Sequence, residues 1–493
     1  MNKSEKTDVI VIGAGLLGCF AARSLRKYNL SVRVLEARED VCTGISKANT
    51  AIVYTGIDNK PGSLKSRLCV RANEGFDRLC EELGVPFNRC GSLLAAFGPK
   101  GEDVIRKKYE RGLKNGVGGV KILSAEESLR MEPNLSPKVK ASLYVPGTGT
   151  VNPWLLCVAA YENAAANGAD FRFNSEVSGI KREDGGFRVS TGDSEYFAKA
   201  VVNCGGLCAD KVREMTEKPL VRIFRTGADY LVLDKNAEGG VSHIIFHEAE
   251  DGNKGLTLVP TVEGSILAGP SSRDDTGVCG AADADGLTYL ENLCGEVVPS
   301  LDMNKIIRSF AGSRPNPFFV EEAGGEYIKT EKSIRDFSIF EEDGLFSFVG
   351  IKTPGLTCAH ELSEYIAGRT VCYLGLSDKN PDFNPVRKPI IKVSDLSFEE
   401  WQALAEKNPA YGRIVCRCGG ITEGEIAEAI RRGAKTVDGV KRRVGTSMGP
   451  CQGSRCREKK AEIISRELSV PLTEVTLDGG TSNLVKGGGG GEI

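Results

Sequence analysis

The chain has 493 residues, a formal charge of −2 and a pI near 6.2. This length exceeds what one hydrophobic core usually supports, so two or three domains are expected. Apolar residues make up 41% and charged residues 26%, as in an ordinary globular protein, and the nearly neutral charge argues against a dedicated nucleic-acid binder.

Sixteen cysteines are many, but a disulfide framework is not expected in a chain of this length without a secretory signal. The first apolar run, residues 9–22, is a poor signal peptide because acidic Glu5 and Asp8 precede it and glycines interrupt it. No stretch approaches the roughly 18–20 apolar residues of a transmembrane helix. We therefore expect a cytoplasmic protein whose membrane association, if any, is made through a partner.

The N-terminal segment predicts a dinucleotide-binding unit. In residues 8–12, Asp8 is followed by four apolar, β-branched residues without alternation, as in a strand buried on both faces of a parallel sheet. The sequence G-A-G-L-L-G follows at 13–18 and opens a predicted helix, and a second strand over 31–35 ends at Glu36. Strand, G-x-G-x-x-G, helix, strand and acid occur in the order that this chemistry requires.

Each part of this fingerprint has a physical task. Gly13 allows the tight turn, Gly15 lets the backbone approach a pyrophosphate, and Gly18 permits close packing of helix and strand. The helix N-terminus supplies N–H donors to the anion, and Glu36 can accept hydrogen bonds from ribose hydroxyls. These residues alone do not distinguish FAD from NAD.

Further motifs follow along the chain, and together they resemble a known family. They are SKANTAIVYTG at 46–56, VVNCGGLCAD at 201–210, FAGSRP at 310–315 and GIKTPGLT at 350–357. In this order they resemble the D-amino-acid-oxidase-like FAD oxidoreductases over roughly residues 6–375. Within that superfamily they are most similar to the branch of anaerobic glycerol-3-phosphate dehydrogenases and L-2-hydroxyglutarate oxidases.

The resemblance implies an α/β fold with two interleaved domains. A Rossmann-like FAD-binding domain is expected from about 6–85, 145–220 and 330–375, and an antiparallel-sheet α+β substrate domain from about 86–144 and 221–329. It also implies that FAD is held by residues beyond the fingerprint, namely Ser46, Asn49, Thr50, Gly205, Gly350, Gly355, Leu356 and Thr357. No second strand–G-x-G-x-x-G–helix unit appears, so a separate NAD domain is not expected.

The C-terminal part of the sequence has a different organisation. Residues 376–412 begin with a polar, proline-bearing stretch and are expected to be a linker, with a short helix over 394–407. A compact module is expected over 413–468, in which Thr422 and Glu425 form a capping box. Residues 469–493, which include five glycines at 487–491, are expected to be a partly disordered tail.

Four cysteines in this module predict a metal centre. Cys416, Cys418, Cys451 and Cys456 are arranged as C-x-C, 32 residues, then C-x4-C. Structural zinc also takes four thiolates, although C-x-C is unusual there, and unliganded buried thiols are a third interpretation. A [2Fe–2S] cluster needs the same four ligands and would give a flavin a one-electron outlet.

This module resembles the bacterioferritin-associated-ferredoxin-like [2Fe–2S] domain over about 55 residues, which implies that the four cysteines are cluster ligands. Its combination with the FAD unit is similar to the large subunits of anaerobic-type glycerol-3-phosphate dehydrogenases. We interpret the basic triple Lys441-Arg442-Arg443 either as a solvated face or as charge that offsets the cluster or meets a partner.

Three residues are candidates for contact with substrate or flavin. The resemblance places Arg314 near the substrate, where a guanidinium can grip carboxylate or phosphate. Lys352 lies in the late flavin turn and could stabilise reduced flavin or bind substrate. Tyr54 stands where many relatives have histidine, so a covalent flavin link is not expected, and the catalytic base is left unassigned.

These observations predict an FAD-dependent dehydrogenase that oxidises a small anionic alcohol, with sn-glycerol 3-phosphate as the first choice. Electrons would pass from FAD through the [2Fe–2S] cluster to a partner, either a flavoprotein or an iron–sulfur subunit. A 2-hydroxy-acid or amino-acid dehydrogenase is one alternative. A non-catalytic flavoprotein that binds metal or regulates a partner is the other.

Overall fold

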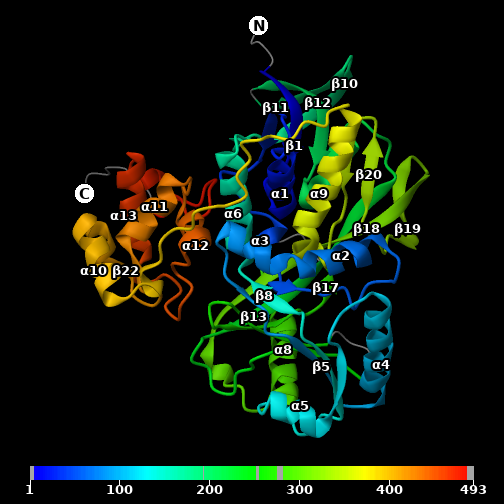
Figure 1. Cartoon of the computed structure of the whole chain (residues 1–493), viewed down its shortest axis with the longest axis vertical. Helices are drawn as coiled ribbons and strands as arrows, with labels where there is room; N and C mark the ends of the chain where they lie inside the picture. The colour runs from blue at the N-terminus through cyan, green and yellow to red at the C-terminus, as the bar shows by residue number, and fades with distance from the viewer. Residues whose placement is uncertain (1–4, 193, 251–254, 275–280, 486–493) are drawn as a thin grey trace, which may run out of the picture. The chain divides into compact units, whose positions relative to one another are not determined.

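The computed structural model describes residues 5–192, 194–250, 255–274 and 281–485, and it divides the chain into two compact units (Figure 1). The larger unit is formed by the chain up to Ala37 together with Cys42–Arg387. The smaller unit is formed by Lys388–Ile493 together with the short segment Arg38–Val41. Residues 38–41 therefore belong to the smaller unit, although the chain on either side of them belongs to the larger unit.

The larger unit contains an eight-stranded sheet whose centre confirms the predicted Rossmann-like fold. Strand β1 lies between β12 and β2 and pairs in parallel with both, while β10, β11 and β12 are joined antiparallel at one edge. Strand β21 also pairs with β12, in parallel. The strands are β1 (Glu5–Ile12), β2 (Val32–Leu35), β9 (Asp170–Arg172), β10 (Val177–Glu183), β11 (Gly186–Thr191), β12 (Glu195–Asn203), β20 (Ile339–Glu342) and β21 (Leu345–Phe348).

Helices from three distant parts of the chain pack together beside this sheet (Figure 1). Helix α1 (Leu16–Leu25) contacts both α6 (Pro153–Ala166) and α9 (Gly355–Tyr373), and nearly all of α1 is buried. The interleaving implied by the resemblance is therefore built around α1. The remaining elements of this region are α2 (Leu64–Glu74), α3 (Phe76–Leu83), α7 (Ala209–Arg213) and a small sheet of β3 (Ile52–Val53), β8 (Gly149–Val151) and β4 (Phe87–Asn88).

The second large sheet has ten strands and lies in the part of the chain expected to be the substrate domain. Its order is β19-β18-β13-β16-β15-β14-β5-β7-β6, with β17 paired to β13. All pairs are antiparallel, as expected, except β14 and β5, which run parallel. The strands are β5 (Ser92–Ala96), β6 (Lys121–Ser124), β7 (Ala141–Val145), β13 (Val221–Leu233), β14 (Ile244–His247), β15 (Thr257–Pro260), β16 (Ile266–Gly269), β17 (Arg273–Asp274), β18 (Ile306–Ala323) and β19 (Glu326–Ser333).

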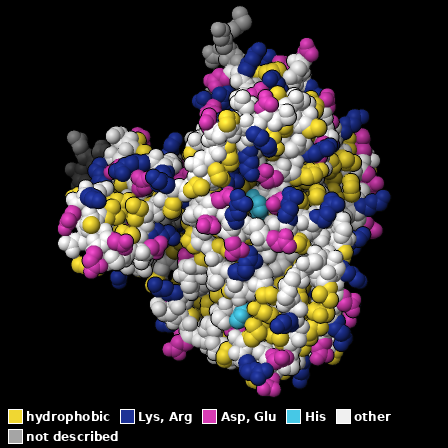
Figure 2. Space-filling model, in the orientation of Figure 1, with side chains coloured by type: hydrophobic (Ala, Val, Ile, Leu, Met, Phe, Trp, Pro, Cys, Tyr) yellow, Lys and Arg dark blue, Asp and Glu magenta, His cyan; other side chains and the backbone are white. Residues whose placement is uncertain are grey.

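Three helices accompany the second sheet: α4 (Pro99–Lys114), α5 (Ala125–Met131) and α8 (Ala284–Val297). Leu290 and Val297 of α8 are buried in one core with Leu231 and Leu258 of the sheet. Figure 2 shows basic and acidic side chains interspersed over the visible face of the larger unit. In the described ranges, no helix is both long and apolar enough to cross a bilayer.

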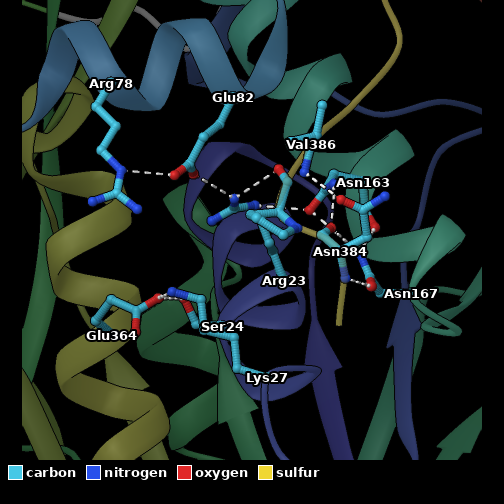
Figure 3. A network of polar contacts seen from close by, with 11 residues as sticks. Arg23, Ser24, Lys27, Arg78, Glu82, Asn163, Asn167, Glu364, Asn384 and Val386 are labelled. Carbon is cyan, nitrogen blue, oxygen red and sulfur yellow. Dashed lines mark hydrogen bonds and ion pairs between the residues drawn. The ribbon is translucent and has the colours of Figure 1, made fainter. Parts of the chain in front are cut away.

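The first part of the expected linker, residues 376–387, is instead packed on the larger unit (Figure 3). Buried Arg23 donates to Asn163 Oδ1 at 2.9 Å and to the Pro385 carbonyl at 3.2 Å. Asn163 in turn donates to the Asn384 carbonyl at 3.0 Å. Although this stretch is polar in composition, it is not a free linker. Its backbone carbonyls accept hydrogen bonds from buried side-chain donors of α1 and α6.

The smaller unit is a compact helical module. It contains β22 (Ile414–Cys416), β23 (Ile421–Thr422), α10 (Phe398–Lys407), α11 (Glu423–Arg431), α12 (Val437–Val444) and α13 (Arg457–Leu468). The predicted capping box is confirmed, since Thr422 and Glu425 bond reciprocally at the start of α11. Of the expected tail, Val475 is buried in the module core, and residues 486–493 lie outside the described part of the chain.

A buried ion cluster ties the segment Arg38–Val41 into this module. Arg443 donates to both carboxylate oxygens of Asp40 at 2.8 Å, and Arg442 donates to Oδ2 at 2.9 Å. Asp40 is 1% exposed, and the side chains of Arg442 and Arg443 are also buried. The interpretation of residues 441–443 as a solvated face was therefore wrong, because two of these charges neutralise a buried carboxylate.

We expect Asp40→Ala to destabilise the smaller unit by about 3–5 kcal/mol, because two buried guanidinium groups would lose their main anion. Chemical unfolding followed through the module's visible absorption measures this. Asp478→Asn is the matched control, since Asp478 also pairs with Arg442 but its side chain is 26% exposed, so its cost should be smaller. Equal costs for the two variants would contradict this account.

The same ion cluster has a definite pH dependence. Burial by itself would raise the pKa of Asp40, but Arg443 and Arg442 lower it to about 2. An unfolded aspartate titrates near 3.9. The stabilisation is therefore fully present above about pH 4 and is lost as the pH falls toward 2.

Candidate functional site

The glycines of the N-terminal turn occupy positions where a side chain does not fit. Gly13 has φ +95°, and a Cβ there would lie 2.7 Å from the carbonyl oxygen of Cys204. A Cβ on Gly18 would lie 1.8 Å from the Gly13 carbonyl oxygen. The first glycine thus permits the turn, and the third permits close approach of α1 to the turn.

The start of α1 is arranged to receive an anion. Gly15 is the N-cap of α1 and provides no side chain to bond the free amides. The Leu16 amide donates to Ser46 Oγ at 3.1 Å, and the Ala14 amide donates to Glu36 Oε2 at 2.6 Å. Glu36 is buried at the end of β2, beside the turn. Helix amides and a carboxylate at this edge fit the pyrophosphate and ribose of a dinucleotide.

The loop from Ser46 to Tyr54 connects the turn with the start of α9. Asn49 shapes the loop, since it donates to the Ser46 carbonyl at 2.8 Å and accepts from the Ala51 amide at 2.8 Å. The side chains of Thr50 and Tyr54 are hydrogen-bonded to each other. The Tyr54 amide donates to Thr357 Oγ1 at 2.9 Å, in the first turn of α9.

The remaining predicted cofactor residues lie in two further turns. Gly205 follows β12, donates to Asn203 Oδ1 at 3.1 Å and lies next to Gly13. Gly350 has φ +70°, and a Cβ there would lie 2.8 Å from Pro317. Gly355 and Leu356 begin α9. The structure thus brings together turns that are separated by more than 300 residues in sequence.

Three cations from three segments lie close together beside these turns. Lys352 donates to Asn316 Oδ1 at 3.0 Å. Burial, followed by the positive charges of Arg314 and Lys65, lowers the pKa of Lys352 to about 8. Among the described residues, no carboxylate lies within ion-pair distance of Lys352 or Arg314. An anion bound here would relieve the repulsion between these charges.

Aromatic residues line the neighbourhood of this cation cluster. Burial raises the pKa of both Tyr54 and Tyr230, and Arg314 lies within electrostatic reach of both phenols. The Tyr230 ring stacks on Phe310 at a centroid distance of 4.8 Å. The two phenols are therefore neutral near pH 7 and can donate hydrogen bonds to a bound oxyanion.

The three histidines of the chain contact a carboxylate or aromatic rings. His243 Nδ1 lies 2.7 Å from Glu132 Oε1, and the His247 ring packs edge-on against Phe97. Burial lowers the pKa of His360 to about 4, and its ring packs against Phe20 and Phe76. None of these contacts gives a histidine base for substrate oxidation, so the base is still unassigned.

Sequence reasoning missed Lys65, Asn316 and Tyr230. Asn316 had a usable signal, because it lies two residues after Arg314 in β18 and alternate residues of a strand share a face. Lys65 had none, since it lies on α2, far from Arg314 in the sequence. The Nζ of Lys65 donates to the Arg335 carbonyl at 2.9 Å, which fixes its ammonium near Arg314 and Lys352.

The four predicted metal ligands gather in the smaller unit as two pairs of thiols. Cys418 Sγ lies 3.4 Å from Cys451 Sγ, and Cys416 is hydrogen-bonded to Cys456. Two thiol pairs fit a [2Fe–2S] cluster, because each of its irons takes two protein ligands.

Backbone amides are aimed at these sulfur atoms. The amide of Ser447 bonds to Cys416 and Cys456, and the amides of Gly453 and Arg455 bond to Cys451. A hydrogen bond from Cys416, with Ser447 and the Lys460 charge, lowers the pKa of Cys456 to about 5 despite its burial. Donors that favour thiolates are what an anionic cluster needs.

Comparison with known families agrees with this division. The family described as FAD dependent oxidoreductase matches residues 8–369. The BFD-like [2Fe-2S] binding domain matches residues 414–466, which contain all four cysteines.

Individual relatives are enzymes of glycerol 3-phosphate. A glycerol 3-phosphate dehydrogenase of Caloramator mitchellensis is 39% identical over 97% of this chain and 98% of its own length. The FAD-bound structure of L-alpha-glycerophosphate oxidase from Mycoplasma pneumoniae is 26% identical, with a TM-score of 0.69 over 78% of this chain and all of the oxidase. A glycerol-3-phosphate dehydrogenase structure from Bacillus halodurans, 19% identical, shares the fold with a TM-score of 0.67 over 94% of this chain and 91% of its own.

We expect Gly18→Ala to abolish FAD binding, because the new Cβ would clash with the Gly13 carbonyl and displace the turn. Flavin absorbance per mole of purified protein measures the loss. Gly295→Ala is the control, since a Cβ at this position on α8 meets open space and alanine favours a helix. A flavin content of Gly18→Ala equal to that of Gly295→Ala would contradict the assignment.

Proposed function

The chain belongs to the FAD-dependent oxidoreductase family, and from this premise we propose that it oxidises sn-glycerol 3-phosphate to dihydroxyacetone phosphate. Its electrons leave through the C-terminal [2Fe–2S] domain to a partner acceptor. The observation that carries the choice of substrate is the cluster of Lys352, Arg314 and Lys65 beside the flavin motifs.

The cation cluster favours a phosphate over a carboxylate. A phosphate monoester carries close to two negative charges at neutral pH, whereas the reacting end of a hydroxy acid carries one. Arg314 can bind two phosphate oxygens in a fork, and Lys352 and Lys65 supply point charges. The same cluster makes a 2-hydroxy acid the second choice.

Residues of the flavin turns would hold the cofactor. Amides at the start of α1, next to Gly13, Gly15 and Gly18, would bind the pyrophosphate, and Glu36 the ribose. Ser46, Asn49, Thr50, Gly205, Gly350, Gly355, Leu356 and Thr357 would form the remaining contacts. FAD held by these residues would supply a hydride acceptor for the substrate carbon, and a [2Fe–2S] cluster held by the four cysteines would supply a one-electron acceptor. Tyr54 would donate a hydrogen bond to substrate or flavin.

The share of this chain that each relative matches favours a dehydrogenase over an oxidase. The Mycoplasma oxidase is matched along its whole length by 78% of this chain, whereas the Caloramator dehydrogenase matches 97% and so includes the cysteine module. An outlet to a protein acceptor replaces direct reaction with oxygen in this proposal. Exposed Arg417, Arg455 and Arg457 beside the cysteines favour a flavoprotein or iron–sulfur acceptor with an acidic contact face.

A cytoplasmic setting is consistent with the thiols. None of the fifteen cysteines in the described residues is joined in a disulfide. Reduced thiols in such number are typical of a reducing compartment.

An anaerobic substrate screen tests this function. The FAD- and cluster-loaded protein is mixed with sn-glycerol 3-phosphate, L-2-hydroxyglutarate, a D-amino acid or glycerol, and flavin bleaching is followed at about 450 nm. We expect rapid bleaching with sn-glycerol 3-phosphate alone. Faster bleaching by L-2-hydroxyglutarate would select the hydroxy-acid alternative, and no bleaching by any compound would select a non-catalytic flavoprotein.

Lys352 gives the reaction a specific pH dependence. Because its pKa is about 8 in the free protein, its ammonium is lost as the pH rises through 8. We expect the KM for sn-glycerol 3-phosphate to rise by about tenfold per pH unit above that point, with a smaller effect on kcat. Lys352→Arg, which stays charged, should remove this dependence. A wild-type KM that is flat from pH 7 to 9.5 would contradict the role of Lys352.

A further inference from the structure

Lys460 is a fully buried lysine beside the cluster cysteines. It lies on α13, one turn after Cys456, and its side chain is 0% exposed. Its Nζ donates to Ser447 Oγ at 2.6 Å and to Thr446 Oγ1 at 3.3 Å. Both hydrogen-bond partners are neutral hydroxyls.

The strongest electrostatic partner of this ammonium is the thiolate of Cys456. Among the described residues, no carboxylate oxygen lies within ion-pair distance of Lys460. Burial lowers the pKa of Lys460, and Arg457 adds to this effect, while the charges of Cys456, Asp438 and Cys416 oppose it at longer range, with Cys456 acting most strongly. A buried ammonium without a nearby anion costs several kcal/mol, so the fold retains it where thiolate charge is present.

Ser447 connects the ammonium to the sulfur atoms. Its hydroxyl lies 3.4 Å from Cys456 Sγ, and its amide bonds to Cys416 and Cys456. Ser447 has φ +64°, in the left-handed region that a serine rarely adopts. The hydrogen bond from Lys460 fixes the Ser447 side chain, so the charge acts on the buried thiol pair both directly and through this contact.

We propose that Lys460 is a positioning residue that raises the reduction potential of the [2Fe–2S] cluster. Reduction adds one electron and no proton, so the cluster becomes more negative by one charge. A fixed cation in a buried site stabilises that added charge more than it stabilises the oxidised form. The proposal rests on the proposed function in one respect: the electron comes from FAD of the same chain.

The test is a dye-mediated titration of the full-length protein with dithionite, in which the reduced cluster is measured by EPR. We expect Lys460→Met to lower the equilibrium constant for reduction at least tenfold, which is 59 mV for one electron. Lys459→Met is the matched control, because Lys459 is exposed one residue earlier and pairs with Glu462. It should leave the potential unchanged.

Two further variants keep the test decisive. Lys460→Arg keeps the charge and should have a potential closer to wild type than Lys460→Met has. If Lys460→Met does not bind iron, Ser447→Ala is measured in its place. This variant removes the hydroxyl, keeps the amide, and should shift the reduction potential in the same direction. An unchanged potential in a loaded Lys460→Met or Ser447→Ala protein would overturn the proposal. Because dithionite supplies the electrons, failure of the substrate assignment would not alter this result.

Discussion

A cation inside a protein requires an anion, and this requirement separates the structural charges of the chain from its functional ones. Arg442 and Arg443 surround Asp40, and Arg23 is paired with Glu82. Lys352 and Lys460, in contrast, have neutral hydrogen-bond partners only. Buried Lys65 likewise donates to a carbonyl oxygen. In the proposed function, these lysines mark the two places where charge arrives from outside the polypeptide.

In the proposed function, the two places correspond to the two ends of an electron path. Lys352 lies in the turn before α9, where a phosphate-bearing substrate would approach the flavin. Lys460 lies beside the buried thiol pair of the iron–sulfur domain. The first charge would hold a substrate that gives up two electrons, and the second would favour a cluster that accepts one at a time. Both roles follow from the same electrostatic rule.

Much of the fold was predictable because its signals are local. The β1-α1-β2 unit is contained in about thirty consecutive residues, and Gly18 is dictated by its contact with the Gly13 carbonyl in the same turn. The cysteine spacing and the capping box of Thr422 and Glu425 are also local. The family resemblance then supplied the interleaving of the two domains, which no short pattern contains.

What could not be predicted depends on contacts between distant residues. Asp40 and Arg443 are 403 residues apart, and nothing in the basic triple indicates that a loop after β2 provides its counterion. Residues 376–387 look like a free linker until their carbonyls are seen to accept from Arg23 and Asn163. Lys65 joined the candidate site only through tertiary structure, because a single lysine on an amphipathic helix carries no signal of its own.

The central claim is that substrate electrons leave through the cysteine module. Anaerobic rapid-freeze EPR of the loaded protein, mixed with sn-glycerol 3-phosphate and sampled alongside flavin absorbance, tests it most directly. We predict that flavin bleaching is followed by the signal of a reduced [2Fe–2S] cluster within a single turnover. Flavin that bleaches while the cluster stays oxidised, with stoichiometric hydrogen peroxide once oxygen is admitted, would contradict it.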